Sequence, residues 1–185
     1  MRTILEAIAA DPDVVSVEEG IKSGLREQLV SGLAGSARSV FVAAMHEKLQ
    51  RPLIVLTHNM FAAQKLIEDL EECLPRGALL SYPANESVAL DAAVASPELT
   101  GQRIETLTRL AGGFRGVLVV PYAGFRRLLP PPEVYRGAVL KVAVGDALPQ
   151  EELLKKLAGI GYTRTERVEH PGEMSVRGGI VDVYP

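Results

Sequence analysis

The chain has 185 residues, 47% of them hydrophobic and 23% charged, and a formal net charge of −3. That length accommodates one domain, or one domain with a small neighbour, and it is sufficient to bury a core. The acidic balance excludes a protein that binds nucleic acid over a broad basic surface, so any DNA contact has to be local.

The N-terminal segment predicts an amphipathic helix, because Ile4, Leu5 and Ile8 recur at helical spacing. No apolar run approaches the roughly 20 residues of a membrane span. Cys73 is the only cysteine, which excludes an internal disulfide and a multi-cysteine zinc site and suits a reducing compartment. We therefore expect a cytoplasmic protein.

Short apolar runs then alternate with longer amphipathic segments. The predicted strands are 27–33, 52–57, 78–83 and 116–121, and the predicted helices are 37–49, 60–74 and 97–111. The continuous apolar run at 52–57 indicates a strand covered on both faces. Asn59 and Ser96 are the expected N-caps, with Pro97 at the first helical position. The alternation predicts an α/β fold with helices around a parallel, helicase-like sheet.

Three consecutive prolines, Pro130 to Pro132, are expected to forbid both helix and central strand, and we place a domain boundary there. We expect a first domain at 1–127 and a small α+β domain at 128–185. The second domain is predicted to contain a strand at 138–145, a helix from Pro149 and antiparallel strands at 163–170, 173–177 and 179–185. The strand-like end of the sequence predicts a fragment of a longer protein.

The stretch "SGLAGSARSVF" at 31–41 has the outline of a phosphate-binding loop, G-x-x-x-x-G-K-[ST]. Gly32, Gly35 and Ser39 are in place between a predicted strand and a predicted helix. Ala37 stands where the second glycine is needed for close backbone approach, and Arg38 replaces the slim lysine with a bulkier planar fork. No apolar run ending in Asp-Glu follows, so the carboxylate that would hold magnesium opposite the loop is missing. We predict no catalysis and no cofactor for this loop.

Other polar residues are weaker candidates. His58 and Asn59 follow a parallel strand at its carboxyl end, where such sheets place ligands, but helix capping explains them as well. The acidic residues Glu86, Asp91 and Glu98 are more typical of helix caps than of an acid–base pair. The histidines have no partner at metal-ligand spacing, so we predict no metal.

Arginines are concentrated near the predicted strands of the second domain. Arg164, Arg167 and Arg177 lie on or beside these strands, and Arg126 and Arg127 precede the boundary. Arginine is favoured in protein interfaces and in phosphate recognition. Solvated surface arginines and a partner-docking surface are both compatible with this pattern.

Several motifs together resemble the N-terminal region of the bacterial transcription-repair coupling factor (Mfd) family. They are "GLAGSARSVF", "LTHNMFAAQKL", "YPANE", "RRLLPPPEV" and "PGEMSVRGGIVDVYP", in the same order along essentially the whole chain. That region is itself similar to the N-terminal part of the excision-repair protein UvrB. The resemblance implies a UvrB-like first domain with a degenerate nucleotide site, followed by a domain that binds UvrA.

The resemblance also implies what the whole family protein does. It displaces stalled RNA polymerase by ATP-driven translocation on double-stranded DNA and recruits UvrA, and its magnesium- and ATP-dependent motor lies downstream of the region resembled here. For this chain the resemblance therefore implies a non-catalytic module, with Arg164, Arg167 and especially Arg177 as the partner-binding residues.

One departure from UvrB concerns DNA. UvrB has a tyrosine-rich hairpin after its third strand, whereas the segment after Tyr82 in this chain, 83–99, has no aromatic residue. Base stacking, worth about 1–3 kcal/mol per base, has no platform there. A nucleotide-binding fragment and a UvrB-like DNA-damage-binding fragment remain the alternative hypotheses.

Overall fold

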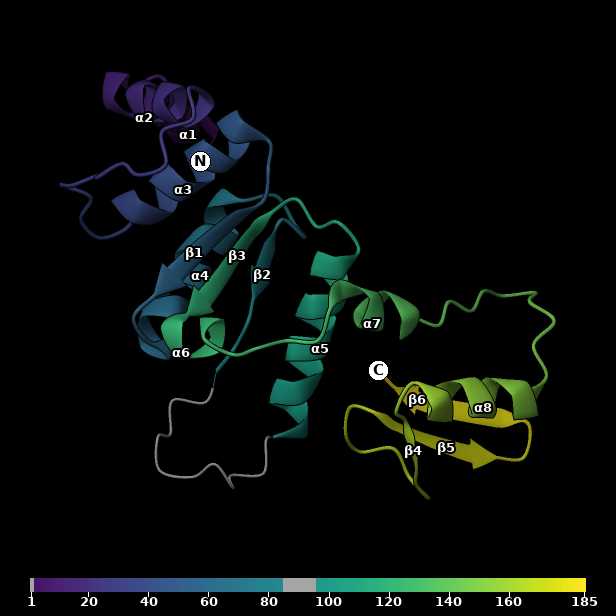
Figure 1. The fold of residues 1–185 in the computed structure, drawn as a ribbon. Coiled ribbons are helices and arrows are strands. Elements are labelled where there is room, and N and C mark those ends of the chain that lie inside the picture. Colours follow the sequence, from purple (N-terminus) through teal and green to yellow (C-terminus); the bar gives the residue numbers. More distant parts are fainter. Residues whose placement is uncertain (1, 85–95) are drawn as a thin grey trace. The chain divides into compact units, whose positions relative to one another are not determined.

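The computed structural model describes residues 2–84 and 96–185, which form helices and two small sheets (Figure 1). The chain separates into two compact units. Unit 1 comprises Met1–Glu86 and Phe114–Arg127, and unit 2 comprises Ser87–Gly113 and Leu128–Pro185. Within the described ranges, no helix is both long and apolar enough to span a membrane.

Unit 1 begins with three helices, α1 (Arg2–Ala9), α2 (Pro12–Lys22) and α3 (Ala37–Leu49). The predicted N-terminal helix and the helix at 37–49 are confirmed. The α2 helix begins after Asp11, whose carboxylate accepts a hydrogen bond from the backbone N–H of Asp13 at 2.9 Å. Both α1 and α2 pack against α3.

The sheet of unit 1 is parallel, as predicted. Its strands are β1 (Leu53–Thr57), β2 (Leu79–Ser81) and β3 (Val117–Pro121), in the order β1-β3-β2. Two further helices belong to this unit, α4 (Met60–Cys73) and α6 (Tyr122–Phe125). Residues of α4 and β3 form the core cluster, in which the fully buried members are Ala63, Leu70, Val117 and Val119.

The cap of α4 is also confirmed. The side chain of Asn59 accepts a hydrogen bond from the backbone N–H of Ala62 at 2.8 Å. This bond satisfies one of the N–H groups that the first helical turn leaves open, and it fixes the chain as it leaves β1.

Two predictions for unit 1 are wrong. Residues 27–33 form no strand, and Leu29 in that segment is 94% exposed. The strand at 52–57 forms, but only one face is covered, since Ile54 and Leu56 are 59% and 48% exposed. An apolar run shows strand tendency, whereas pairing and coverage depend on neighbours that the run itself does not specify.

Unit 2 contains α5 (Pro97–Ala111), which packs against the short helix α7 (Pro132–Gly137). The side chain of Arg136 donates from Nε to the carbonyl oxygen of Ala111 at 2.7 Å and ties these helices together. The prediction that the three prolines forbid a helix is wrong at Pro132, which is the first residue of α7. A proline is tolerated there because its missing N–H would have had no helical partner.

The second sheet lies beside α8 (Gln150–Gly159) and consists of β4 (Thr163–Arg164), β5 (Glu173–Arg177) and β6 (Ile180–Tyr184) (Figure 1). The predicted antiparallel sheet is only partly correct, because β5 pairs antiparallel with β6 but parallel with β4. The predicted strand at 138–145 is absent, and Val142 in that segment is 54% exposed.

Candidate functional site

The loop with the outline of a phosphate site is folded onto itself. Gly32 and Gly35 adopt φ values of 82° and 55°, which a residue with a side chain rarely takes up. Ala37 is the first residue of α3, and the Arg38 side chain turns back, donating from Nε to the carbonyl oxygen of Leu33 at 3.3 Å. The cation is thus engaged by the loop's own backbone.

Ser39 is the residue that a working loop uses to bind magnesium. Here its side chain is 1% exposed, and its hydroxyl donates to a carboxylate oxygen of Asp69 on α4 at 3.0 Å. The hydroxyl therefore joins α3 to α4 instead of facing the loop. This contact supports a structural role for the loop position.

A cleft of about 560 Å³ lies elsewhere in unit 1, beside β1. Its lining comes from α2, α3, β1 and the segment 24–30, and none of it comes from 31–40. The charged lining side chains are Arg26 and Arg51, and the rest of the lining is largely apolar. The cleft is thus separate from the phosphate-loop positions.

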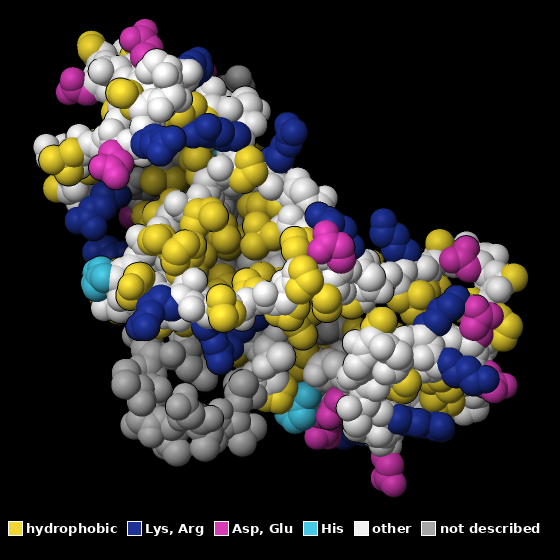
Figure 2. All heavy atoms as spheres, viewed as in Figure 1, with side chains coloured by type: hydrophobic (Ala, Val, Ile, Leu, Met, Phe, Trp, Pro, Cys, Tyr) yellow, Lys and Arg dark blue, Asp and Glu magenta, His cyan; other side chains and the backbone are white. Residues whose placement is uncertain are grey.

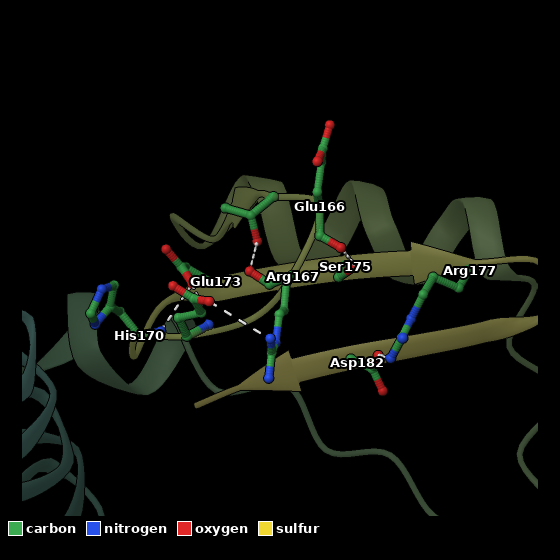
Figure 3. A network of polar contacts seen from close by, with 9 residues as sticks. Glu166, Arg167, His170, Glu173, Ser175, Arg177 and Asp182 are labelled. Atoms are coloured by element: carbon green, nitrogen blue, oxygen red, sulfur yellow. Dashed lines mark hydrogen bonds and ion pairs between the residues drawn. The ribbon is translucent and has the colours of Figure 1, made fainter.

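The three candidate arginines of unit 2 have different surroundings, and Figure 3 shows those of Arg167 and Arg177. Arg177 is 73% exposed and donates from Nη2 to a carboxylate oxygen of Asp182 on β6 at 2.6 Å. Arg167 is 86% exposed, and its Nε lies 4.0 Å from the carboxylate of Glu169. Within residues 2–84 and 96–185, the exposed Arg164 side chain makes no hydrogen bond or ion pair.

The strand register separates Arg164 from Arg177. Arg164 pairs with Met174 on β5. Arg177 is three residues further along β5, an odd number, so its side chain is on the opposite face from that of Met174. Because side chains alternate along a strand, these two arginines project from opposite faces of the sheet. Each face is covered in its middle, by burial of Met174 on one side and of Ser175 on the other, while Arg164 and Arg177 are both exposed.

The loop between β4 and β5 is held in place by its own hydrogen bonds. The carboxylate of Glu173 accepts from the backbone N–H groups of Glu169 and His170 at 2.7 and 2.9 Å. These two bonds lower the pKa of Glu173 below its ordinary value of 4.5. The hydroxyl of Ser175 donates to the carbonyl oxygen of Glu166 at 2.8 Å. The loop that carries Arg167 is thus fixed against β5.

The same loop contacts α5 within unit 2. His170 Nδ1 lies 3.4 Å from a carboxylate oxygen of Glu98. Hydrogen bonds from the Ser96 hydroxyl and from the backbone N–H of Glu98 lower the pKa of the Glu98 carboxyl, and His170 adds to the effect. A side-chain carbon at Gly101 would lie 3.0 Å from Pro171, so this glycine permits close approach.

The remaining candidates are the possible metal ligands, Cys73 and the acidic residues around the segment after Tyr82. No group of three His, Cys, Asp or Glu side chains that could hold a metal ion occurs in the described part of the chain. Burial raises the pKa of the Cys73 thiol, and Asp69 and Glu72 add to the effect. Glu86, Asp91 and most of the segment after Tyr82 lie outside the described residues.

Known proteins resemble the chain along its whole length. Residues 140–185 match the family described as UvrB interaction domain. The transcription-repair-coupling factor of Bacillus subtilis (strain 168) is 42% identical over 185 residues, which are 100% of this chain and 16% of that protein. The chain is a relative of the transcription-repair-coupling factors.

Further relatives carry the same description. The transcription-repair-coupling factor of Staphylococcus haemolyticus (strain JCSC1435) is 34% identical over 162 residues, and that of Staphylococcus aureus (strain USA300) is 35% identical over 162 residues. Each alignment covers 88% of this chain and 14% of the relative. The chain thus spans about a sixth of the length of the curated transcription-repair-coupling factors that it matches.

Sequence reasoning missed the acidic partner of Arg177. Asp182 lies on the neighbouring strand, diagonally opposite Arg177, because Arg177 pairs with Ile180 and Asp182 pairs with Ser175. The alternation in "SVRGGIVDV" contained this signal, since a two-glycine turn places Arg177 and Asp182 on one face of a hairpin.

Proposed function

We propose that this chain is a non-catalytic docking module of a transcription-coupled repair factor, and that unit 2 binds the excision-repair protein UvrA. The observation that carries the proposal is the match of residues 140–185 to the UvrB interaction domain, within a chain that resembles transcription-repair-coupling factors throughout. In the whole protein, the module would recruit UvrA to RNA polymerase stalled on damaged double-stranded DNA.

The binding surface that we propose centres on Arg177. Its guanidinium is exposed, yet Asp182 holds one of its nitrogen atoms at 2.6 Å, so the planar fork is already oriented on the β5–β6 hairpin. Fixing a long side chain in advance lowers the entropy lost on binding. Ile180 pairs with Arg177 and is 63% exposed, and Tyr184, 43% exposed, lies further along the same face, so this face also offers apolar area.

Arg167 and Arg164 are proposed as secondary contacts. Arg167 extends from the loop that the Glu173 carboxylate fixes, as Figure 3 shows. Arg164 projects from the opposite face, at the edge of the sheet, so one partner surface has to reach around β4 to touch both arginines.

We also propose the domain division after residue 127, with the UvrA-binding part at 128–185.

The absence of nucleotide chemistry is part of the same proposal. Ser39 is buried against Asp69, so it offers no magnesium ligand, and Arg38 donates from Nε to the loop backbone instead of standing where the lysine of a phosphate loop would. Equilibrium titration with a fluorescent ATP analogue tests this part. We expect no saturable binding, and micromolar binding that Ser39→Ala abolishes would contradict it.

Calorimetry with purified UvrA tests the docking function. We expect the intact chain to bind, and a variant carrying both Arg164→Glu and Arg177→Glu to lose most of the affinity. Failure of the intact chain to bind UvrA, or equal binding by the double variant, would contradict the proposal.

A further inference from the structure

The carboxyl edge of the sheet in unit 1 carries exposed aromatic side chains. β1 and β3 are neighbours in register, with Thr57 opposite Pro121, so the residues after both strands emerge at one edge. Phe61, at the start of α4, is 79% exposed, and Tyr122 and Phe125 on α6 are 55% and 54% exposed. These are the exposed aromatic side chains among the described residues of unit 1. Their shared position is at the end of a parallel sheet where α/β proteins bind ligands.

The same edge has an unusual charge distribution. The segments 53–67, 79–84 and 114–127, which hold the three strands and the residues after them, contain no Asp or Glu, although the chain has 23. Arg126 and Arg127 are exposed at the end of α6. Figure 2 shows Lys and Arg side chains beside hydrophobic ones in the region where Figure 1 draws α6. This edge is thus locally cationic on a chain of net charge −3.

The aromatic and cationic groups are presented together. The guanidinium carbon of Arg126 lies 5.8 Å from the centroid of the Tyr122 ring, a distance at which a cation interacts with an aromatic face. In the described part of the chain, the Arg127 side chain makes no hydrogen bond or ion pair. His58 directly follows β1 and is exposed, and the exposed Lys65 lies further along α4.

We propose that this edge binds single-stranded nucleic acid, independently of the docking function of unit 2. Unpaired bases would stack on Phe61, Tyr122 and Phe125, and backbone phosphates would pair with Arg126 and Arg127. Charge complementarity favours this occupant, because the described segments 53–67, 79–84 and 114–127 offer cations to a polyanion and contain no carboxylate side chain. Flat aromatic faces next to cations are the combination that recognises single strands without regard to sequence.

Fluorescence anisotropy of the intact chain with a labelled oligothymidine strand tests the proposal. We expect binding at about 50 mM salt that weakens as salt rises. Tyr122→Ala and Phe125→Ala should each weaken binding about tenfold. Arg126→Gln with Arg127→Gln should reduce the slope of log K against log salt by about 1.4, since each lost phosphate contact contributes about 0.7.

The control variant carries Lys155→Gln and Lys156→Gln, which remove the same charge from α8 in unit 2 and should leave binding within about twofold of the unaltered chain. Thermal unfolding verifies that the exposed-site variants stay folded. No binding of the strand at low salt would overturn the proposal. It would equally be overturned if the α6 variants and the control weakened strand binding alike. The same holds if the aromatic substitutions left strand binding unchanged and weakened only the binding of a protein such as UvrA.

Discussion

The hydroxyl of Ser39 donates a hydrogen bond to Asp69 across 3.0 Å, joining the first turn of α3 to α4. In a phosphate loop, the same position would face a magnesium ion. Here the side chain is 1% exposed and packs inside unit 1, so the position stabilises the contact between two helices. The loop has the frame of a nucleotide site, and its key hydroxyl is used for folding.

Ser39→Ala should therefore destabilise the protein. The variant loses one hydrogen bond and leaves the half-buried Asp69 carboxylate without its donor, a cost of about 1–2 kcal/mol in the free energy of unfolding. Urea denaturation measures it. Ser36→Ala is the matched control, because the exposed Ser36 side chain makes no cap hydrogen bond. Equal urea midpoints for Ser39→Ala and the unaltered chain would contradict this account.

Glu18 should make stability depend on pH. Hydrogen bonds from Lys22 at 2.6 Å and then from Lys48 at 2.5 Å lower the pKa of the Glu18 carboxyl below its ordinary value of 4.5. A carboxyl with a lowered folded-state pKa contributes stability above its unfolded pKa and loses it as pH falls through the folded pKa. The urea concentration at the unfolding midpoint should thus decrease as the pH is lowered below about 4.5. This decrease should be less steep in Glu18→Gln.

The same variant has a second consequence at neutral pH. Lys48 on α3 is only 19% exposed, and Glu18 on α2 is its counter-charge. Glu18→Gln should therefore lower the urea midpoint at pH 7, whereas Glu27→Gln, an exposed control, should not. If both variants had the same midpoint and the same pH profile, the ion pair between α2 and α3 would have no role in stability.

Gly116 should not tolerate a side chain. A Cβ at this position would overlap the carbonyl oxygen of Ala78 and the ring of Phe114, and the backbone oxygen cannot move without disturbing the start of the sheet. Gly116→Ala should cost on the order of 3 kcal/mol in the free energy of unfolding. Gly159→Ala is the comparison, because a Cβ there meets no atom within 4 Å, and it should leave stability unchanged or slightly raised.

The uneven coverage of the parallel sheet gives a further prediction. Leu70 is fully buried against β3, so Leu70→Ala should cost about 2–5 kcal/mol in the free energy of unfolding. Leu56 is 48% exposed on β1, and Leu56→Ala should cost less than about 1 kcal/mol. Thermal or urea unfolding compares the two variants, and a similar loss in both would show that the outer face of β1 is covered.

The elements that the sequence predicted well are those specified by local signals. Residues 37–49 and 60–73 are helical as their periodicity indicates, and Asn59 caps the second of these helices. These features depend on residues close together in the chain, and so the sequence contains most of the information needed.

The elements that the sequence predicted poorly depend on distant partners. Segment 27–33 resembles a short strand and segment 138–145 has strand-like alternation, but no neighbouring strand pairs with either in the described structure. The burial of Ser39 against Asp69 and the pairing of Arg177 with Asp182 likewise join residues whose proximity only the fold determines. Residue types therefore indicate which side chains are candidates for a site, whereas the contacts between those side chains follow only from the fold.

The most direct measurement of the central proposal is the affinity of the intact chain for UvrA, compared between two charge reversals. Arg177→Glu removes the oriented guanidinium on the β5–β6 hairpin, and Arg76→Glu reverses an equally charged, exposed residue in unit 1. We predict that Arg177→Glu raises the dissociation constant about tenfold or more and that Arg76→Glu leaves it within about twofold. Equal affinities for the two variants, or no binding of UvrA by the unaltered chain, would contradict the account.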